Sequence, residues 1–196
     1  MQGFEISKEE LEALPIKAYE GNVVLIDHYS LIDSAAALII KESIIGVDCE
    51  SKPSFKKGQQ HPVSLIQIAT SDHVFLFRIN KSGITSSLIE ILENKEIIKV
   101  GIDLHHDMIN LQKIKEFSPK SIVDLNALAK EKGFLNTGAK KLSALLLGFR
   151  ISKRMQTTNW EAAVLNEKQI KYAATDAWIS REVYLKLRAM KQSKTP

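Results

Sequence analysis

The sequence predicts a single α/β domain whose mixed β-sheet is covered by helices on both faces. Three observations lead to this prediction. Apolar segments of strand length alternate with segments of helical periodicity along most of the chain. The 196 residues fit one domain, and no linker, repeat or low-complexity segment divides them. With 44% hydrophobic and 26% charged residues, the composition is that of a globular protein that buries its own core.

The first half of the chain alternates between strands and helices. A capping box formed by Ser7 and Glu10 predicts a short helix that ends at Pro15. Apolar runs bounded by polar residues, Gly or Pro predict strands at 22–27, 43–50, 63–69 and 73–77. Apolar residues at helical spacing predict two further helices at 31–41 and 84–94.

The second half is mainly helical. Two more strands are expected at 97–102 and 122–124. Helices are predicted at 103–115, 125–131, 140–147 and 166–191. Asp103 begins the first of these helices and Asp124 immediately precedes the second, and an aspartate side chain at such a position caps the first turn.

Cysteine content and hydropathy exclude several classes of protein. The single cysteine, Cys49, has no disulfide partner in the chain and excludes a zinc module built on cysteines. The apolar stretches are too short to cross a bilayer, and the first fifteen residues lack the apolar core of a signal peptide. We therefore expect an intracellular, cytoplasmic protein without a membrane partner, and the sequence specifies no oligomeric state.

Charge is distributed unevenly along the chain. Residues 1–50 carry three Lys against ten acidic residues, whereas residues 51–196 carry 24 Lys and Arg against 13 acidic residues. A basic body is typical of proteins that bind polyanions such as nucleic acid. A lysine-rich surface in contact only with solvent would give the same count.

Two pairs of residues are spaced so that their side chains share a face. Asp48 and Glu50 stand two apart at the end of an apolar strand, so their carboxylates point the same way. Tyr172 and Asp176 stand four apart on a helix, one turn from each other, among small alanines that allow close packing. Carboxylate pairs of this kind suit hard divalent cations, although two charges at an exposed strand end would look alike.

A third acidic residue, Asp107, lies in the first turn of the helix that follows the strand 97–102. The adjacent His105 and His106 invite a zinc interpretation, but no third nitrogen or sulfur ligand stands at a useful spacing. Glycine-rich phosphate loops and the G-x-S-x-G nucleophile motif are absent from the sequence. The acidic residues Asp48, Glu50, Asp107 and Asp176 therefore stay the main candidates for binding a metal ion.

These three segments resemble a known set of motifs. VDCE at 47–50, VGIDLHHD at 100–107 and YAATD at 172–176 are similar to the three exonuclease motifs of the DEDD superfamily. A tyrosine four residues before the last aspartate is typical of its ribonuclease D and Werner-exonuclease branch. The resemblance continues through SLIQIAT at 64–70, LLGF at 146–149 and the segment 159–178, and it covers roughly residues 23–187.

The resemblance implies a ribonuclease H-like fold, with a five-stranded mixed sheet between helices, formed by one exonuclease domain over residues 1–196. It implies that Asp48, Glu50, Asp107 and Asp176 hold two divalent cations, Mg²⁺ or Mn²⁺, and that Tyr172 positions the attacking water. The implied activity is 3′→5′ hydrolysis of RNA or DNA, with release of nucleoside 5′-monophosphates. Asp103 departs from the usual second motif by adding an acid.

Two segments rich in Lys and Arg flank these motifs and contain no acidic residue. We expect them to contact the phosphates of a nucleic acid through Lys52, Lys56, Lys57, Lys140, Lys153 and Arg154. Phe55 would either stack on a base or pack beneath its loop. Trp160 is expected to anchor the last helix, and Gln67 to satisfy buried backbone groups.

Three alternatives stay open at this point. The first is a catalytically inactive nucleic-acid-binding module on the same fold. The second is an adaptor protein whose binding face is basic, and the third is a nuclease that cuts internally. The presence of all four acids and the tyrosine favours an active exonuclease.

Overall fold

A computed structural model describes residues 3–56 and 58–190. Within these residues, six strands form one sheet in the order β1-β4-β3-β2-β5-β6. Their bounds are β1 (Asn22–Ile26), β2 (Ile44–Ser51), β3 (Val63–Ala69), β4 (His73–Phe77), β5 (Ile98–Gly101) and β6 (Ile122–Asp124). The helices are α1 (Lys8–Ala13), α2 (Ile32–Ile39), α3 (Ile79–Ser82), α4 (Ser86–Glu93), α5 (Leu104–Gln112), α6 (Leu125–Glu131), α7 (Ala139–Leu147) and α8 (Glu167–Ala189).

The sheet is mixed, as predicted. β3 pairs antiparallel with both β2 and β4, whereas β2–β5, β5–β6 and β1–β4 are parallel pairs. The count of five strands implied by the resemblance is wrong, because the described sheet has six. The additional edge strand β1 uses the hydrogen-bonding groups that β4 would otherwise leave unpaired.

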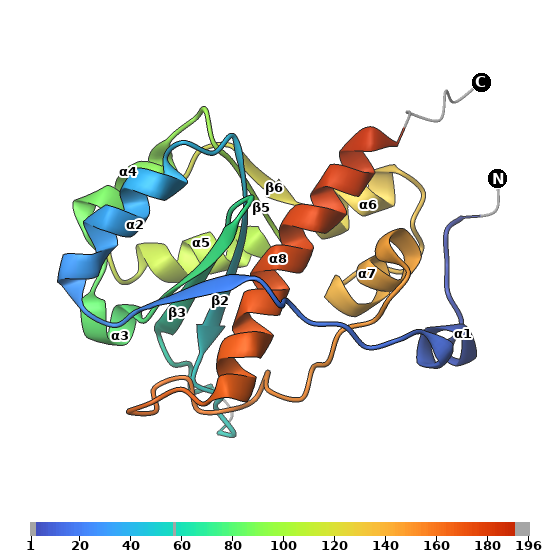
Figure 1. The fold of residues 1–196 in the computed structure, drawn as a ribbon, viewed down its shortest axis with the longest axis horizontal. Coiled ribbons are helices and arrows are strands. Elements are labelled where there is room, and N and C mark those ends of the chain that lie inside the picture. The colour runs from blue at the N-terminus through green and yellow to red at the C-terminus, as the bar shows by residue number, and fades with distance from the viewer. Residues whose placement is uncertain (1–2, 57, 191–196) are drawn as a thin grey trace.

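Helices cover both faces of the sheet, which confirms the predicted layers (Figure 1). One face packs against α2, α4 and α5 through apolar side chains such as Ile39, Leu92 and Leu111. The other face packs against the long helix α8, whose residues Ala173, Ala174 and Ala177 lie over β3 and β4. Among the described residues, no helix is both long and apolar enough to cross a membrane.

The predicted helix caps are partly correct. Asp124 caps α6 by accepting hydrogen bonds from the backbone N–H groups of Asn126 and Ala127, at 2.9 and 3.2 Å. Asp103 makes no capping hydrogen bond, so its predicted role is wrong. Its backbone is left-handed (φ 58°), and the second carboxylate oxygen of Asp124 accepts the Leu104 N–H at 3.1 Å instead. A single aspartate therefore joins the starts of α5 and α6.

Helix α8 approaches β2 closely at one glycine. A Cβ atom built on Gly46 would lie 2.1 Å from the carbonyl oxygen of Ala177. The absence of a side chain on Gly46, together with the small side chain of Ala177, lets the helix lie almost on the strand. This contact confirms the close packing predicted from the alanines and places the middle of α8 directly against β2.

We expect Gly46→Ala to lower the free energy of unfolding by about 1–3 kcal/mol, because the added methyl group meets rigid backbone atoms. The shift of α8 would also separate Asp176 from β2. Urea denaturation and a cleavage assay measure the two effects. Ser43→Ala, at the exposed residue just before β2, is the control, and unchanged stability of Gly46→Ala would contradict the close contact.

Candidate active site

Two carboxylates of the candidate site stand at the end of β2. Asp48 pairs with Gln67 of β3 and Glu50 pairs with Leu65, so both acids lie on the face of the sheet that α8 covers. The register shifts between Glu50 and Ser51, where β2 ends its pairing with β3. The acids therefore stand at the last regular positions of a buried strand.

Helix α8 adds a third carboxylate. One ligand atom each from Asp48, Glu50 and Asp176 lies within 4.8 Å of the others, and in the described ranges these form the only group of three or more potential metal ligands. Asp176 and Glu50 are only 4% and 8% exposed, and Asp48 is half-buried. Hard oxygen atoms in this number and spacing are the ligand set that Mg²⁺ and Mn²⁺ prefer, so the residues fit a divalent cation.

Lys153 supplies positive charge to this group. Its Nζ atom lies 3.2 and 3.1 Å from the two carboxylate oxygens of Asp176 and 5.5 Å from the centre of the Tyr172 ring. The lysine comes from the loop that joins α7 to α8, so tertiary packing brings it to the acids. One ammonium group balances only part of the charge of three carboxylates.

The acids of this group have raised pKa values, because they are buried close to one another. Burial raises the pKa of Glu50 to about 8, and the negative charge of Asp176 adds to the shift. Burial, followed by the charges of Asp176 and Asp107, raises the pKa of Asp48 well above its usual range. Burial also raises the pKa of Asp176, although the Lys153 ammonium opposes the change. Positive charge brought by a cation would reverse these shifts.

Asp107 stands beside the three acids but outside their 4.8 Å group. It lies in the first turn of α5, and its charge contributes to the raised pKa values of both Asp48 and Glu50. Burial and the neighbouring Asp103 and Asp124 raise its own pKa to about 8. Asp107 is thus close enough to influence the group electrostatically.

Because these carboxyl groups have raised pKa values, the metal-free protein should lose stability as the pH rises. Below about pH 4 the groups are protonated in both states, and between about pH 4 and pH 8 the folded protein holds protons that the unfolded chain has released. Each such proton lowers the free energy of unfolding by about 1.4 kcal/mol per pH unit. Urea denaturation in EDTA at pH 5 and pH 8 measures this loss.

Glu50→Gln, whose amide resembles the protonated acid, should lose less stability between the two pH values. Saturating Mn²⁺ should restore the wild-type protein at pH 8. Equal or higher wild-type stability at pH 8 in EDTA would contradict the raised pKa values.

Tyr172 stands on α8 one turn before Asp176. Burial, followed by the charges of Asp176 and Glu50, raises its pKa well above 10, so the phenol stays protonated. Its ring packs against Trp160, with 5.9 Å between the ring centres. Trp160 is fully buried, which confirms its predicted packing role.

The predicted phosphate-binding residues differ in burial and in ion pairing. Lys153 reaches Asp176, whereas Lys52 pairs with Glu161 at 3.4 Å. Arg154 and Lys56 are exposed, and Lys140 is half-buried at the start of α7. Lys57 lies outside the described residues.

The structure also bears on the predicted roles of four further side chains. The expectation that Gln67 satisfies backbone groups is wrong: it is fully buried, and within the described ranges neither amide atom has a hydrogen-bond partner. Phe55 is 89% exposed, so it does not pack beneath its loop. The zinc interpretation of His105 and His106 gains no support, because both are exposed and neither belongs to the potential ligand group described above.

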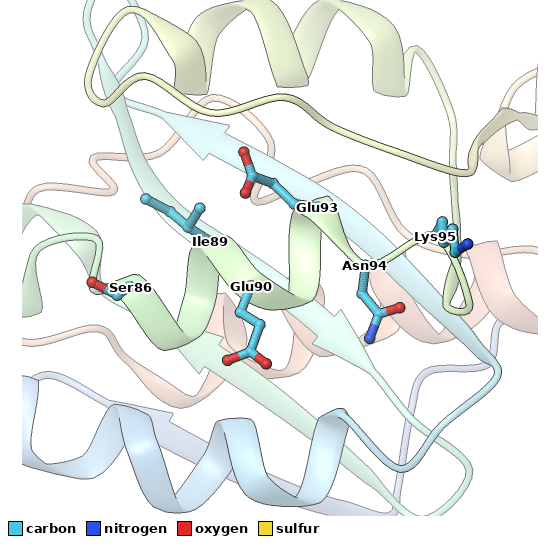
Figure 2. A pocket seen from close by; sticks show the side chains of 6 residues that line it. All are labelled: Ser86, Ile89, Glu90, Glu93, Asn94 and Lys95. Carbon is cyan, nitrogen blue, oxygen red and sulfur yellow. The ribbon is translucent and has the colours of Figure 1, made fainter.

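Away from these acids, a hollow of about 660 Å³ lies along α4, on the face of the sheet opposite to α8 (Figure 2). The figure shows Glu90 and Glu93, three residues apart on the helix, pointing away from each other. The hollow is wide open to solvent and contains none of the acids described above. Its size alone therefore does not make it a reaction site.

Comparison with known proteins decides the family. A model of the 3′-5′ exonuclease domain matches residues 23–192, which is most of the chain. The chain belongs to the 3′-5′ exonuclease family. All three motifs and the residues of the candidate active site lie within the matched range.

Individual exonucleases agree with this assignment. A 3′-5′ exonuclease of Arabidopsis thaliana is 30% identical over 92% of this chain and 68% of its own length. The bifunctional 3′-5′ exonuclease and ATP-dependent helicase WRN of Mus musculus is 29% identical over 93% of this chain and 14% of its own. The chain therefore spans only part of the larger exonuclease proteins.

Ribonuclease D of Trypanosoma brucei, in complex with the RNA U12, superposes with a TM-score of 0.77 at 18% identity, covering 89% of this chain and 65% of the other. This similarity places the exonuclease domain in the ribonuclease H-like fold. The resemblance to the DEDD superfamily, which includes the Werner exonuclease, is confirmed by the family match and by these relatives.

Proposed function

We propose that this exonuclease domain hydrolyses RNA or DNA from the 3′ end and releases nucleoside 5′-monophosphates with the help of two divalent cations. The observation that carries the proposal is the group of three carboxylates within 4.8 Å, on β2 and α8, inside the segment that matches the family. The functional unit would be one domain with its core at 23–187. We propose an intracellular, cytoplasmic location, because a single cysteine in 196 residues is typical of proteins from reducing compartments.

Four acids would hold the cations, which we propose are Mg²⁺ or Mn²⁺. Asp48, Glu50 and Asp176 form the compact group, and Asp107 approaches it from α5. When bound, two such ions activate a water molecule and stabilise the leaving 3′ oxygen of a phosphodiester. Without them, Lys153 is the one described cation in contact with the acids, so the group offers a substrate phosphate little positive charge.

Tyr172 would orient the attacking water with its hydroxyl group. A phenol whose pKa lies well above 10 does not act as a base at neutral pH, but it donates one hydrogen bond and accepts others. Its position one turn from Asp176 directs the hydroxyl group to the carboxylates. Lys153, already in contact with Asp176, would be available for a substrate phosphate once cations replace it.

Phosphate contacts along the substrate would come from Lys52, Lys56, Lys57, Lys140, Lys153 and Arg154. The ribonuclease D of Trypanosoma brucei that shares the fold is known in complex with RNA, which supports nucleic acid as the partner. Its identity to this chain is low, so the choice between RNA and DNA rests on the assay below.

We expect binding of a single-stranded oligonucleotide to weaken with salt, with a log–log slope of about −0.7 for each neutralised phosphate. Replacing Lys140, Lys153 and Arg154 by Ala should make the slope shallower, because fewer counterions are released on binding. Fluorescence anisotropy in EDTA measures the slope. A matched triple replacement of the exposed Lys41, Lys113 and Lys120 is the control, and equal slopes in both variants would show that the predicted residues face only solvent.

A degradation ladder tests the function itself. Single-stranded RNA and DNA, labelled at either end, are incubated with Mg²⁺, Mn²⁺ or EDTA. The proposal expects stepwise shortening from the 3′ end, nucleoside 5′-monophosphate products and no reaction in EDTA. Binding without shortening would identify the inactive module, and cleavage of a circular substrate would identify an internal nuclease.

A further inference from the structure

A pocket of about 200 Å³ lies on the outer side of α8, and we call it the α8 outer pocket. The segment 16–18 forms one side, the loop 152–155 forms another, and positions 168, 171, 172 and 175 of the helix form the base. These helix positions lie along one face, at spacings of three and four residues. Figure 1 shows the blue N-terminal segment crossing the front of α8 beside the orange loop that precedes the helix.

Backbone hydrogen bonds hold the walls of the pocket in place. The Lys17 N–H donates to the carbonyl of Arg150 at 3.0 Å, and the Arg150 N–H donates to the carbonyl of Pro15 at 2.9 Å. The Tyr19 N–H donates to the Thr175 hydroxyl at 3.0 Å, which fixes the segment to α8. These hydrogen bonds join the walls of the pocket to each other and to α8.

The interior of the pocket is apolar, and its rim is basic. Ile16, Ala18 and Met155 supply apolar surface, and Ile16 is 56% exposed. Lys17, Arg154, Lys168 and Lys171 supply positive charge, and no acidic residue is among the lining residues.

Two of these cations are already engaged. Lys171 forms an ion pair with Glu20, and the Lys17 ammonium lies 5.3 Å from the centre of the Phe149 ring. In the described part of the chain, Arg154 and Lys168 form no ion pair. An anion that carries a flat apolar group would satisfy both the rim and the interior.

The pocket adjoins the candidate active site. Tyr172 contributes to its wall, and the loop residues Ser152 and Arg154 line it on either side of Lys153, which reaches Asp176. The volume is below the roughly 300–1,000 Å³ of pockets for drug-sized ligands, so it suits one small ligand rather than a folded strand.

We propose that the α8 outer pocket binds a nucleoside phosphate, with the base against Ile16, Ala18 and Met155 and the phosphate at Arg154 and Lys168. The proposal rests on the proposed exonuclease function, because that function brings nucleotides to this loop. The nucleotide is either one unit of the substrate strand or a free mononucleotide, and the experiment separates these two sources.

Calorimetric titration with adenosine 5′-monophosphate, and anisotropy with a single-stranded oligoadenylate, are carried out in EDTA. Without cations the acids have no ion through which to bind phosphate, so binding reports on other sites. Ala18→Phe fills the pocket, Ile16→Ser removes part of its apolar surface if the first variant does not fold, and Lys168→Glu reverses a charge on the rim. Lys41→Glu, an equal charge change beyond the end of α2, is the control.

If the pocket holds free nucleotide, the pocket variants should weaken adenosine monophosphate binding about tenfold or more, and the control should not. If the pocket holds a nucleotide of the strand, only the oligonucleotide should bind. The pocket variants should then weaken oligonucleotide binding, and the control should not. The proposal is overturned if the pocket variants bind both probes like the control. It is also overturned if Lys168→Glu alone weakens binding, since that outcome indicates a charged surface without a pocket.

The degradation ladder reports on the exonuclease separately. A chain that binds a nucleotide in this pocket but does not hydrolyse RNA or DNA would refute the proposed function and keep the pocket. A chain that hydrolyses its substrate while the pocket variants bind normally would refute the pocket alone.

Discussion

Asp48→Asn and Asp176→Asn should each abolish hydrolysis while leaving the fold intact. Each amide has nearly the volume of the acid it replaces, so packing around α8 is preserved, but the charge that attracts a divalent cation is removed. Above about pH 8, where the acids are ionised, removing one of several crowded charges also relieves repulsion, since like charges 4 Å apart cost about 4 kcal/mol at an effective dielectric of 20. We therefore expect the metal-free variants to be at least as stable as the wild type.

Single-turnover cleavage of a 3′-labelled oligonucleotide measures the loss of activity, and urea denaturation in EDTA measures stability. Glu116→Gln, which removes an exposed carboxylate at a distance from the group, is the matched control. Near-native cleavage by either aspartate variant would disprove the proposed ligand set. A large fall in the stability of the metal-free variants would show that the acids serve the fold instead.

Tyr172→Phe should lower the rate of hydrolysis by about 10²–10⁴, the range of a positioned proton-handling group, without weakening cation binding. The hydroxyl group is directed at Asp176, and its raised pKa keeps it protonated, so it orients water rather than removing a proton. The ring still packs against Trp160 in the phenylalanine variant. The change therefore removes one hydrogen-bonding group and little else.

Mn²⁺ titration by calorimetry and single-turnover cleavage separate the two effects. Tyr184→Phe, a buried tyrosine three turns further along α8, is the matched control. Asp176→Asn should lose both Mn²⁺ affinity and cleavage, whereas Tyr172→Phe should lose only cleavage. A wild-type rate in Tyr172→Phe would mean that this tyrosine contributes packing alone.

Local sequence spacing was sufficient to predict the elements of the sheet and the orientation of each residue pair. Side chains two apart on a strand, such as Asp48 and Glu50, share a face whatever the rest of the fold does. Residues four apart on a helix, such as Tyr172 and Asp176, lie one turn from each other for the same local reason. Hydrophobic periodicity likewise located α2 and α4 along the chain.

The distance between the two pairs depends on tertiary packing. Asp48 and Asp176 are far apart in the chain, and they meet because Gly46 lets α8 lie almost on β2. The resemblance to known motifs was the only sequence signal that joined them, since no local pattern encodes an approach of two backbones.

Other features also followed from packing rather than from sequence spacing. Asp124, rather than Asp103, caps α5, because the parallel strands β5 and β6 end side by side. In the sequence, Lys153 is one of several lysines predicted to contact phosphate. The fold places its ammonium group 3.1 Å from Asp176. The sequence alone determined the strands, the described helices other than the short α3, and the residue types at the site. Only the tertiary structure decided which charges face one another, because electrostatic contacts depend on distances that span the whole fold.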